Sequence, residues 1–271
     1  MIAYAYLIGW RLVRLMPEKL ALKLFYAIGD YTFRKNGKSV KRLRKNMHRI
    51  SGLSGRDLEV LTRNAMNSYM RYWCETFRIP DWSKDRIVNN VELVNGHLLT
   101  DALDSGKGAV VALPHSGNWD HAAAYFLSRG YKAITVAERL KPERLFRAFL
   151  KFRQNIGLEV LSTDMRTIPT LIQKAKDGYI IALVADRDLS ENGIEVDFFG
   201  EIAKMPAGPI LISQRAGVDL IGAFIIYTEN GIKIFFEKLE LNVQAEADFF
   251  AANLKRHPVD WHMLQRIWIN D

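Results

Sequence analysis

From residue 91 onward, short apolar runs alternate with longer segments of helical periodicity. The apolar runs cover residues 107–114, 133–137, 158–161 and 179–185, and the helical segments between them cover residues 118–127, 142–155 and 167–176. A short apolar run bounded by Gly, Pro or charged residues is too brief for a helix and suits a buried strand. Strands that alternate with helices predict an α/β fold with a mostly parallel central sheet flanked by helices.

The two ends of the chain add other elements to this core. The N-terminal third shows helical spacing only, at residues 17–28, 39–50 and 57–77. The C-terminal third is expected to hold two further strands, a hairpin and a helix, at residues 195–199, 218–227, 223–237 and 246–257. The hairpin is indicated by Asn230-Gly231, a favoured pair for a tight turn between strands. We therefore expect a helical N-terminal region in front of the α/β core.

The chain is long and apolar enough to form one domain. It has 271 residues, of which 49% are hydrophobic, and it shows no repeat, low-complexity tract or flexible linker. We expect a single domain over residues 1–271, with residues 91–271 as its α/β catalytic core. The one cysteine, Cys74, excludes an internal disulfide and fits a reducing compartment. Because Cys74 lies in an apolar helical stretch, we expect an inert buried thiol.

The positive charge of the chain belongs to its N-terminal segment. Residues 1–50 contain twelve Lys and Arg against two acids, whereas the whole chain carries +8, so residues 51–271 sum to −2. Nucleic acids and anionic membrane surfaces both attract such a basic segment. No nucleic-acid-binding motif is recognisable and the rest of the chain is slightly acidic, so no nucleic-acid partner is expected.

The first residues favour a membrane surface. Residues 1–10 are apolar and end in Trp10, with Arg11 and Arg14 next, and aromatic side chains beside arginines suit the bilayer interface. The run is shorter than the about 20 apolar residues that cross a bilayer, and it lacks the features of a signal peptide. We predict a peripheral helix within a basic amphipathic segment, residues 1–50. The alternative is an ordinary buried helix with one solvated face.

A histidine and an aspartate follow the first predicted strand of the sheet. His115 comes directly after residues 107–114, and Asp120 lies at the start of the next predicted helix. Ligand sites of open α/β sheets lie at this carboxyl edge. A neutral imidazole can remove the proton of an attacking hydroxyl, and a carboxylate on its other ring nitrogen fixes the tautomer. We predict His115 as a general base that Asp120 orients.

Two other interpretations of His115 stay open at this point. It is a satisfied structural histidine, or it forms a metal site with Asp120 and His121. No further cluster of His, Cys or Asp stands at ligand spacing, so no metal is expected. A serine nucleophile is not indicated either, because Ser116 lacks the Gly-x-Ser-x-Gly setting.

The stretch from Ala112 to Asp120, with the sequence ALPHSGNWD, resembles the His-x4-Asp block of the lysophospholipid and lipid A acyltransferase superfamily. Further segments resemble one branch of it, the phosphatidylinositol mannoside acyltransferases of actinobacteria. They are residues 9–18, 43–46, 135–143, 185–189, 196–200, 205–209 and 253–264. The resemblance spans nearly the whole chain and is far more specific than the His-x4-Asp block alone.

This resemblance implies transfer of a long acyl chain, typically palmitoyl, from acyl-CoA to a mannose hydroxyl of a phosphatidylinositol mannoside. It implies no cofactor beyond the co-substrate acyl-CoA, and a place at the cytoplasmic face of the plasma membrane. By the family pattern His115 is the base and Asp120 its partner. Glu138, Arg153 and a later acid, for which Glu195 ranks first, are implied to lie near the reacting groups.

Polar residues also follow two other predicted strands. Glu138 follows residues 133–137, and Asp186 and Arg187 follow residues 179–185. If the strands are parallel, these side chains lie at the same sheet edge as His115, which makes them candidate substrate-binding residues. The alternative is a set of helix caps and loop ion pairs.

Other functions explain less of the sequence. A non-enzymatic membrane adaptor accounts for the amphipathic start but gives no reason for a His and an Asp after a buried strand. The closer rival is a related acyltransferase with another acceptor, such as a lipid A precursor or a lysophospholipid, or with acyl carrier protein as donor.

Overall fold

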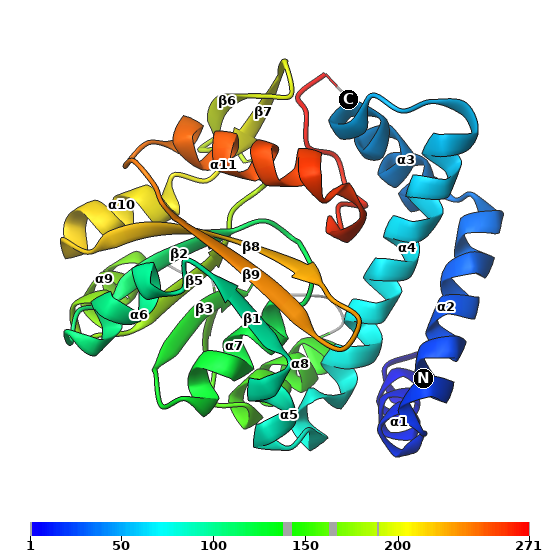
Figure 1. Cartoon of the computed structure of the whole chain (residues 1–271), viewed down its shortest axis with the longest axis horizontal. Helices are drawn as coiled ribbons and strands as arrows, with labels where there is room; N and C mark the ends of the chain where they lie inside the picture. The colour runs from blue at the N-terminus through cyan, green and yellow to red at the C-terminus, as the bar shows by residue number, and fades with distance from the viewer. Residues whose placement is uncertain (1, 138–142, 163–166, 189, 271) are drawn as a thin grey trace.

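A seven-stranded sheet with helices on both faces forms the centre of the molecule (Figure 1). The computed structural model describes residues 2–137, 143–162, 167–188 and 190–270. In spatial order the strands are β1 (Val91–Val94), β9 (Ile232–Lys238), β8 (Asp219–Tyr227), β2 (Ala109–Leu113), β5 (Ile180–Val184), β3 (Ala133–Ala137) and β4 (Glu159–Ser162). All neighbouring pairs in this order are parallel except β8 and β9, which form the expected hairpin. The predicted α/β fold class is confirmed.

Helices bury this sheet from both sides. They are α5 (Lys84–Asn89), α6 (His97–Asp104), α7 (Trp119–Ser128), α8 (Glu143–Asn155), α9 (Thr167–Lys176), α10 (Gly208–Ala216) and α11 (Val243–Arg256), with the 3-10 turns η1 (Ile79–Asp81) and η2 (Pro258–Asp260). Along β2, Val110 and Ala112 join one hydrophobic cluster, whereas Val111 and Leu113 join another. Because successive side chains of a strand point to opposite faces, β2 is buried on both, which explains its uninterrupted apolar sequence.

The N-terminal region is helical, as predicted. It consists of α1 (Ile2–Leu15), α2 (Glu18–Lys35), α3 (Lys38–Ser51) and α4 (Gly55–Arg78). The long helix α4 stands between α2 and the sheet, so it forms a wall beside the strand ends (Figure 1). Gly52 ends α3 in the left-handed conformation, at a φ of 68°, which an L side chain adopts only at a cost. None of the described helices is long and apolar enough to cross a membrane.

A separate antiparallel ribbon packs against α11. It consists of β6 (Ile194–Phe198) and β7 (Glu201–Met205). The sequence predicted a strand close to β6 but missed β7, because Glu201 and Lys204 interrupt any apolar run there. The ribbon tolerates these charges because exposed and buried residues alternate along it.

The strand order decides what lies beside His115. β2 and β5 are direct neighbours, and Leu113 pairs with Val184 at their ends. His115 stands two residues after β2, and Asp186 stands two residues after β5. Side chains that are 71 residues apart in the sequence therefore leave the sheet side by side.

Candidate active site

His115 and Asp186 form a hydrogen-bonded pair at the carboxyl edge of the sheet. The imidazole Nδ1 lies 2.6 Å from Asp186 Oδ1, and the backbone N–H of His115 donates to Oδ2 at 3.0 Å. Burial alone raises the pKa of Asp186, but the neighbouring His115 and the N–H donors outweigh it and hold the pKa below its ordinary value. Asp186 is therefore an anion at neutral pH, and Nδ1 carries the proton that it accepts. The Nε2 atom of His115 is left with a free lone pair for a proton.

The His115 side chain is 39% exposed, whereas Asp186 is completely buried. The imidazole is thus accessible from outside and its partner is not. Asp186 cannot contact a substrate directly, so its prediction as a substrate-binding residue is wrong. Its place is behind the imidazole, where it accepts the proton of Nδ1.

The loop that carries His115 has little freedom. Gly117 adopts a φ of 56°, and a Cβ at this position would stand 2.6 Å from the carbonyl oxygen of Ile225 on β8. The Ser116 hydroxyl accepts the backbone N–H of Ile225 at 3.2 Å, so Ser116 is buried and structural. Asn118 caps α7 by accepting the N–H of His121. These contacts hold the imidazole in one place relative to the sheet.

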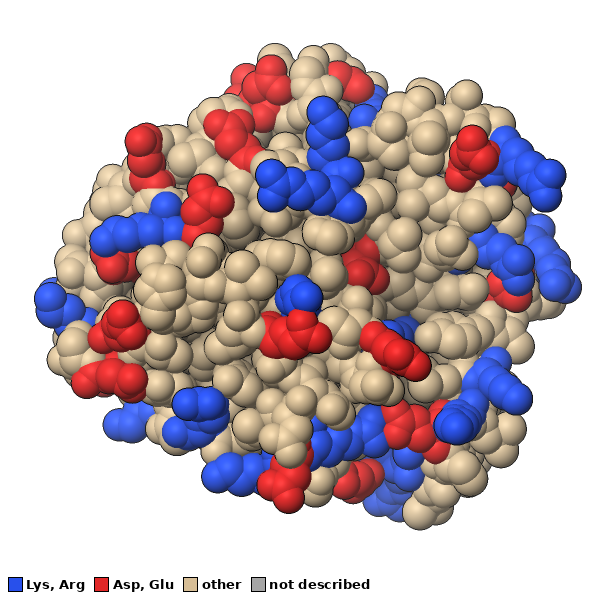
Figure 2. Space-filling model, viewed as in Figure 1, with Lys and Arg blue, Asp and Glu red and all other residues tan. Residues whose placement is uncertain are grey.

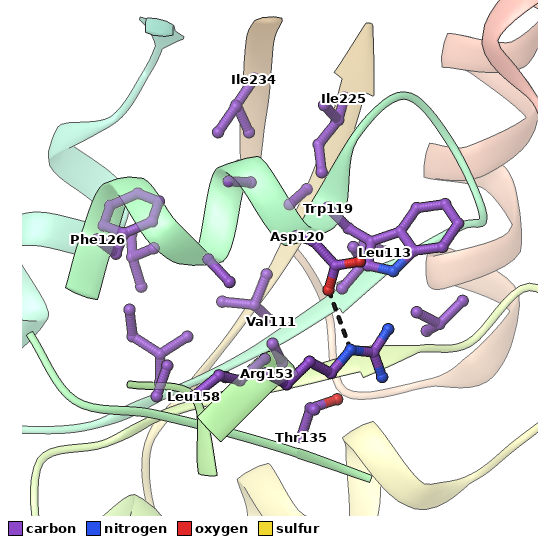
Figure 3. Close-up of a pocket in the computed structure, with 18 of the residues that line it drawn as sticks. Val111, Leu113, Trp119, Asp120, Phe126, Thr135, Arg153, Leu158, Ile225 and Ile234 are labelled. Carbon is purple, nitrogen blue, oxygen red and sulfur yellow. Dashed lines mark hydrogen bonds and ion pairs between the residues drawn. The ribbon is translucent and has the colours of Figure 1, made fainter. Parts of the chain in front are cut away.

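Asp120 does not contact His115 through any hydrogen bond in the described structure, and the prediction that it orients the imidazole is wrong. Its Oδ1 accepts the N–H of Arg153 Nε on α8 at 3.0 Å (Figure 3). Its Oδ2 accepts the Tyr72 hydroxyl on α4 at 2.9 Å. Asp120 is the second residue of α7 and faces α4 and α8 rather than the loop after β2. Burial lowers the pKa of Arg153, but Asp120 outweighs this effect and raises it, so the guanidinium stays charged.

An apolar cavity lies on the α7 side of the sheet, and the Asp120–Arg153 pair stands at its edge (Figure 3). Its walls combine alanines with large apolar side chains. They are Leu99, Val111, Leu113, Ala122, Ala123, Phe126, Ala133, Leu158, Ile180, Ala182, Val184, Ala223, Ile225, Ile234 and Phe236. The alanines leave room between the strands and α7, so the cavity suits an apolar chain rather than a polar ligand.

A second, open cleft of about 560 Å³ contains His115. Arg187 and Asp188 also line it, together with the N-terminal turn of α10. The cleft and the apolar cavity share Trp119, Val136, Arg153 and Val184 in their walls. His115 therefore stands in a solvent-open cleft that shares four wall residues with the apolar cavity.

Comparison with known proteins gives the family. The family model described as bacterial lipid A biosynthesis acyltransferase matches residues 1–270. The chain belongs to this family. Among curated relatives, the phosphatidylinositol mannoside acyltransferase of Mycolicibacterium smegmatis is 40% identical over 98% of this chain and 91% of the relative. The protein of the same name from Mycobacterium tuberculosis (strain ATCC 25618 / H37Rv) is 37% identical over 99% of this chain and 89% of the relative.

The protein is therefore an acyltransferase, and its remaining predicted site residues can be placed. Arg153 and Arg187 both line the cleft that contains His115. Glu195 is exposed on β6, opposite Lys204, and lines neither the cleft nor the cavity. Its predicted catalytic role stays a prediction. Glu138 lies outside the described residues.

The three predicted membrane-binding residues of the acyltransferase lie in different environments. Trp10 is buried, donates its indole N–H to the carbonyl oxygen of Phe77 and packs against Phe149, so its predicted membrane contact is wrong. Arg14 forms an ion pair with Asp81. Arg11 is exposed and stays a candidate.

The alternatives for the histidines can now be judged. His121 is buried, donates from Nε2 to the carbonyl oxygen of Ile87 and packs against Trp82, so it is a core residue of the acyltransferase. Within the described ranges, no three His, Cys, Asp or Glu side chains could hold a metal ion. Cys74 is buried, and burial raises the pKa of its thiol to about 12, which agrees with an inert core residue.

Sequence reasoning missed two contributors to the site. Asp186 was noticed at a strand end, but its partnership with His115 needed the order of β2 and β5. Trp261, which donates its indole N–H to Asp186 Oδ2 at 2.8 Å, carried no local signal.

Proposed function

We propose that this acyltransferase moves a palmitoyl chain from acyl-CoA to a mannose hydroxyl of a phosphatidylinositol mannoside. The names of the two mycobacterial relatives support the acceptor. The observations that carry the chemistry are the His115–Asp186 pair and the wall residues that its cleft shares with the apolar cavity, which we take as the junction of the two. An acyl chain in the cavity brings its thioester to this junction, and an alcohol in the cleft reaches the same point.

The proposed reaction needs no nucleophile from the protein. Nε2 of His115 removes the proton of the acceptor hydroxyl while that oxygen attacks the thioester carbonyl carbon. The tetrahedral intermediate collapses, the C–S bond breaks, and the CoA thiolate takes the proton from the imidazolium. The products are an ester and free CoA, and His115 is neutral again. Asp186 stabilises the imidazolium between the two proton transfers.

Arg153 is the cation best placed to stabilise the oxyanion of this intermediate. It lines both the cavity and the cleft and is held by Asp120 at 3.0 Å. A preorganised cation that is mostly withdrawn from water stabilises developing negative charge more strongly than a fully solvated one. In this proposal Asp120 acts on catalysis through Arg153 and not through His115.

We assign the apolar acyl chain and the charged phosphates of the substrates to the cavity and the cleft by polarity. The acyl chain lies in the apolar cavity, where each buried methylene contributes about 0.8 kcal/mol. Arg187, in the open cleft, binds a phosphate of the acceptor lipid or of CoA through charge-assisted hydrogen bonds.

The enzyme approaches its lipid substrate with the outer face of α1 and α2. Leu12 and Leu15 on α1 are exposed, Leu15 by 82%, and Leu20, Leu24 and Ile28 recur every fourth residue along α2. Figure 2 shows Lys and Arg side chains along the right-hand edge of the molecule, over α2 and α3. An apolar stripe beside cations fits peripheral binding to an anionic leaflet, and we propose the cytoplasmic face of the plasma membrane.

A product analysis tests the proposed function. The purified enzyme is incubated with palmitoyl-CoA and a phosphatidylinositol mannoside in mixed micelles, and lipids are identified by mass spectrometry. We expect one added palmitoyl group on a mannose, and none with His115→Gln, which keeps a polar side chain but removes the base. Parallel reactions contain a lipid A precursor, a lysophospholipid, or palmitoyl-acyl carrier protein. Preferential acylation of another acceptor, or use of the carrier protein alone, would replace the proposed substrates.

A further inference from the structure

The segment from Pro258 to Met263 is bound to the loop that carries His115. The backbone N–H of His262 donates to the carbonyl oxygen of His115 at 2.7 Å, and the N–H of Gly117 donates to the carbonyl oxygen of Asp260 at 2.9 Å. Ser116 and Trp261 form an isolated antiparallel bridge. The sequence resemblance included this segment without giving it a role. Its contacts place it directly behind the proposed catalytic base.

Trp261 connects this segment to the buried carboxylate. Its indole N–H donates to Asp186 Oδ2 at 2.8 Å, and the same oxygen accepts the backbone N–H of His115 at 3.0 Å. Two donors on Oδ2 leave Oδ1 facing the imidazole Nδ1 at 2.6 Å. The carboxylate therefore has one orientation in which all of its donors are satisfied.

The indole ring itself cannot move easily. Trp261 is completely buried, with Phe198 at 6.2 Å and Trp268 at 6.3 Å between ring centroids, both in edge-to-face geometry. Phe198 belongs to β6, so the ribbon outside the sheet supports the ring. This support gives the indole N–H a fixed direction toward Asp186.

We propose that Trp261 is a positioning residue for the acyl transfer, which holds Asp186 ionised and aligned so that His115 keeps the tautomer of a base. The inference rests on the proposed role of His115. Trp261 acts through Asp186 and touches no substrate. A buried carboxylate that loses one donor is less stable as an anion, and it is free to rotate away from the imidazole.

Burial favours the neutral form of two other titratable groups near the pair. Glu246 on α11 is buried near Asp186, and burial raises its pKa well above the ordinary value. His262 is buried beside His115, and burial lowers its pKa to about 3. Both shifts favour the neutral forms of Glu246 and His262. A shift of the acidic limb in the pH profile of kcat therefore reports on the His115–Asp186 pair.

The test replaces the indole with a ring that has no N–H. Trp261→Phe should lower kcat by about 10- to 100-fold, the usual loss for one hydrogen bond to a buried charge, with KM for palmitoyl-CoA changed by less than about threefold. The indole N–H is the positive end of a dipole, so its removal favours proton binding to the His115–Asp186 pair. The acidic limb of the kcat profile should therefore move to higher pH by about half a unit or more.

Trp268→Phe is the matched control. Trp268 is also completely buried and donates its indole N–H, but to the carbonyl oxygen of Phe198 at 2.7 Å rather than to Asp186. The phenyl ring of this variant still packs against Trp261, so stability should fall by a similar amount while kcat and the acidic limb stay close to those of the wild type. Benzothienylalanine at position 261, which exchanges the N–H for sulfur, repeats the test at nearly constant volume in case Trp261→Phe does not fold.

The inference is overturned if the folded variant at position 261 keeps wild-type kcat and an unmoved acidic limb, or if Trp268→Phe shows the same changes. Release of CoA from palmitoyl-CoA to water, measured without any lipid acceptor, tests the same pH profile. A wild-type enzyme that hydrolyses acyl-CoA but acylates no mannoside would refute the proposed acceptor and leave the role of Trp261 testable.

Discussion

Replacement of Asp186 by Asn tests which of two carboxylates, Asp186 or Asp120, orients the His115 imidazole. The carboxamide introduced by Asp186→Asn has the same shape as the carboxylate, but two N–H donors, from Trp261 and the His115 backbone, already point at the Oδ2 position. The amide oxygen must therefore occupy that position, and the amide NH2 faces Nδ1. Nδ1 then accepts, Nε2 carries the proton, and the base is lost. We expect kcat to fall by about 10⁴-fold, as for the equivalent change in a serine protease, or about 5 kcal/mol.

The assay follows release of free CoA with a thiol reagent. Cys74, the one cysteine of the chain, is buried and its thiol has a pKa of about 12, so it adds little background. KM for palmitoyl-CoA should change little because Asp186 is buried away from the cleft. Circular dichroism must show a native fold in the variant.

Asp120→Asn is the informative comparison. It removes the charge that compensates the buried Arg153, which should cost about 3–5 kcal/mol of unfolding free energy. Activity should fall through the displaced Arg153, with the acidic limb of the pH profile in place. The reasoning is refuted if Asp186→Asn keeps near wild-type turnover while a folded Asp120→Asn loses the general-base activity and with it the acidic limb of the pH profile.

Three further predictions concern the cavity, the outer face and pH. Ala133→Leu fills the cavity at the amino end of β3, about 13 Å along the strand from its carboxyl end. The value of kcat/KM for palmitoyl-CoA should therefore fall at least about tenfold relative to that for decanoyl-CoA. An unchanged ratio of the two kcat/KM values contradicts the assignment of this cavity to the acyl chain. Leu15→Asp with Leu20→Asp should weaken flotation with anionic liposomes at an unchanged Tm, whereas equal flotation removes α1 and α2 from the interface. Burial lowers the pKa of His121 to about 4, below its unfolded value, so this residue's contribution of about 3 kcal/mol is present above pH about 6.5 and lost as pH falls toward 4. Urea unfolding of wild type and His121→Gln should show the stability gap shrinking over that range, and a constant gap contradicts a neutral buried ring.

The sequence by itself determined the class of fold and the position of the proposed base. Strands and helices follow local periodicity, so β2, β3, β4 and β5 could be predicted from apolar runs and their boundaries. His115 could be found because the end of a buried strand is visible in the sequence. The strand β7 could not, because its charges are tolerated only in a ribbon that leaves the main sheet.

Only the tertiary structure decided which groups meet. The sequence offered Asp120 as the partner of His115 because it is close along the chain, but the packing of α7 against α4 and α8 turns it toward Arg153. Asp186 reaches the imidazole because β5 pairs with β2, and no local pattern encodes strand order. The sequence around Trp10 is the same whether this residue binds a membrane or lies in a core. Only its packing against Phe77 and Phe149 shows that it lies in the core. Hydrophobic periodicity is local, whereas burial and hydrogen-bond partners depend on residues far apart in the chain.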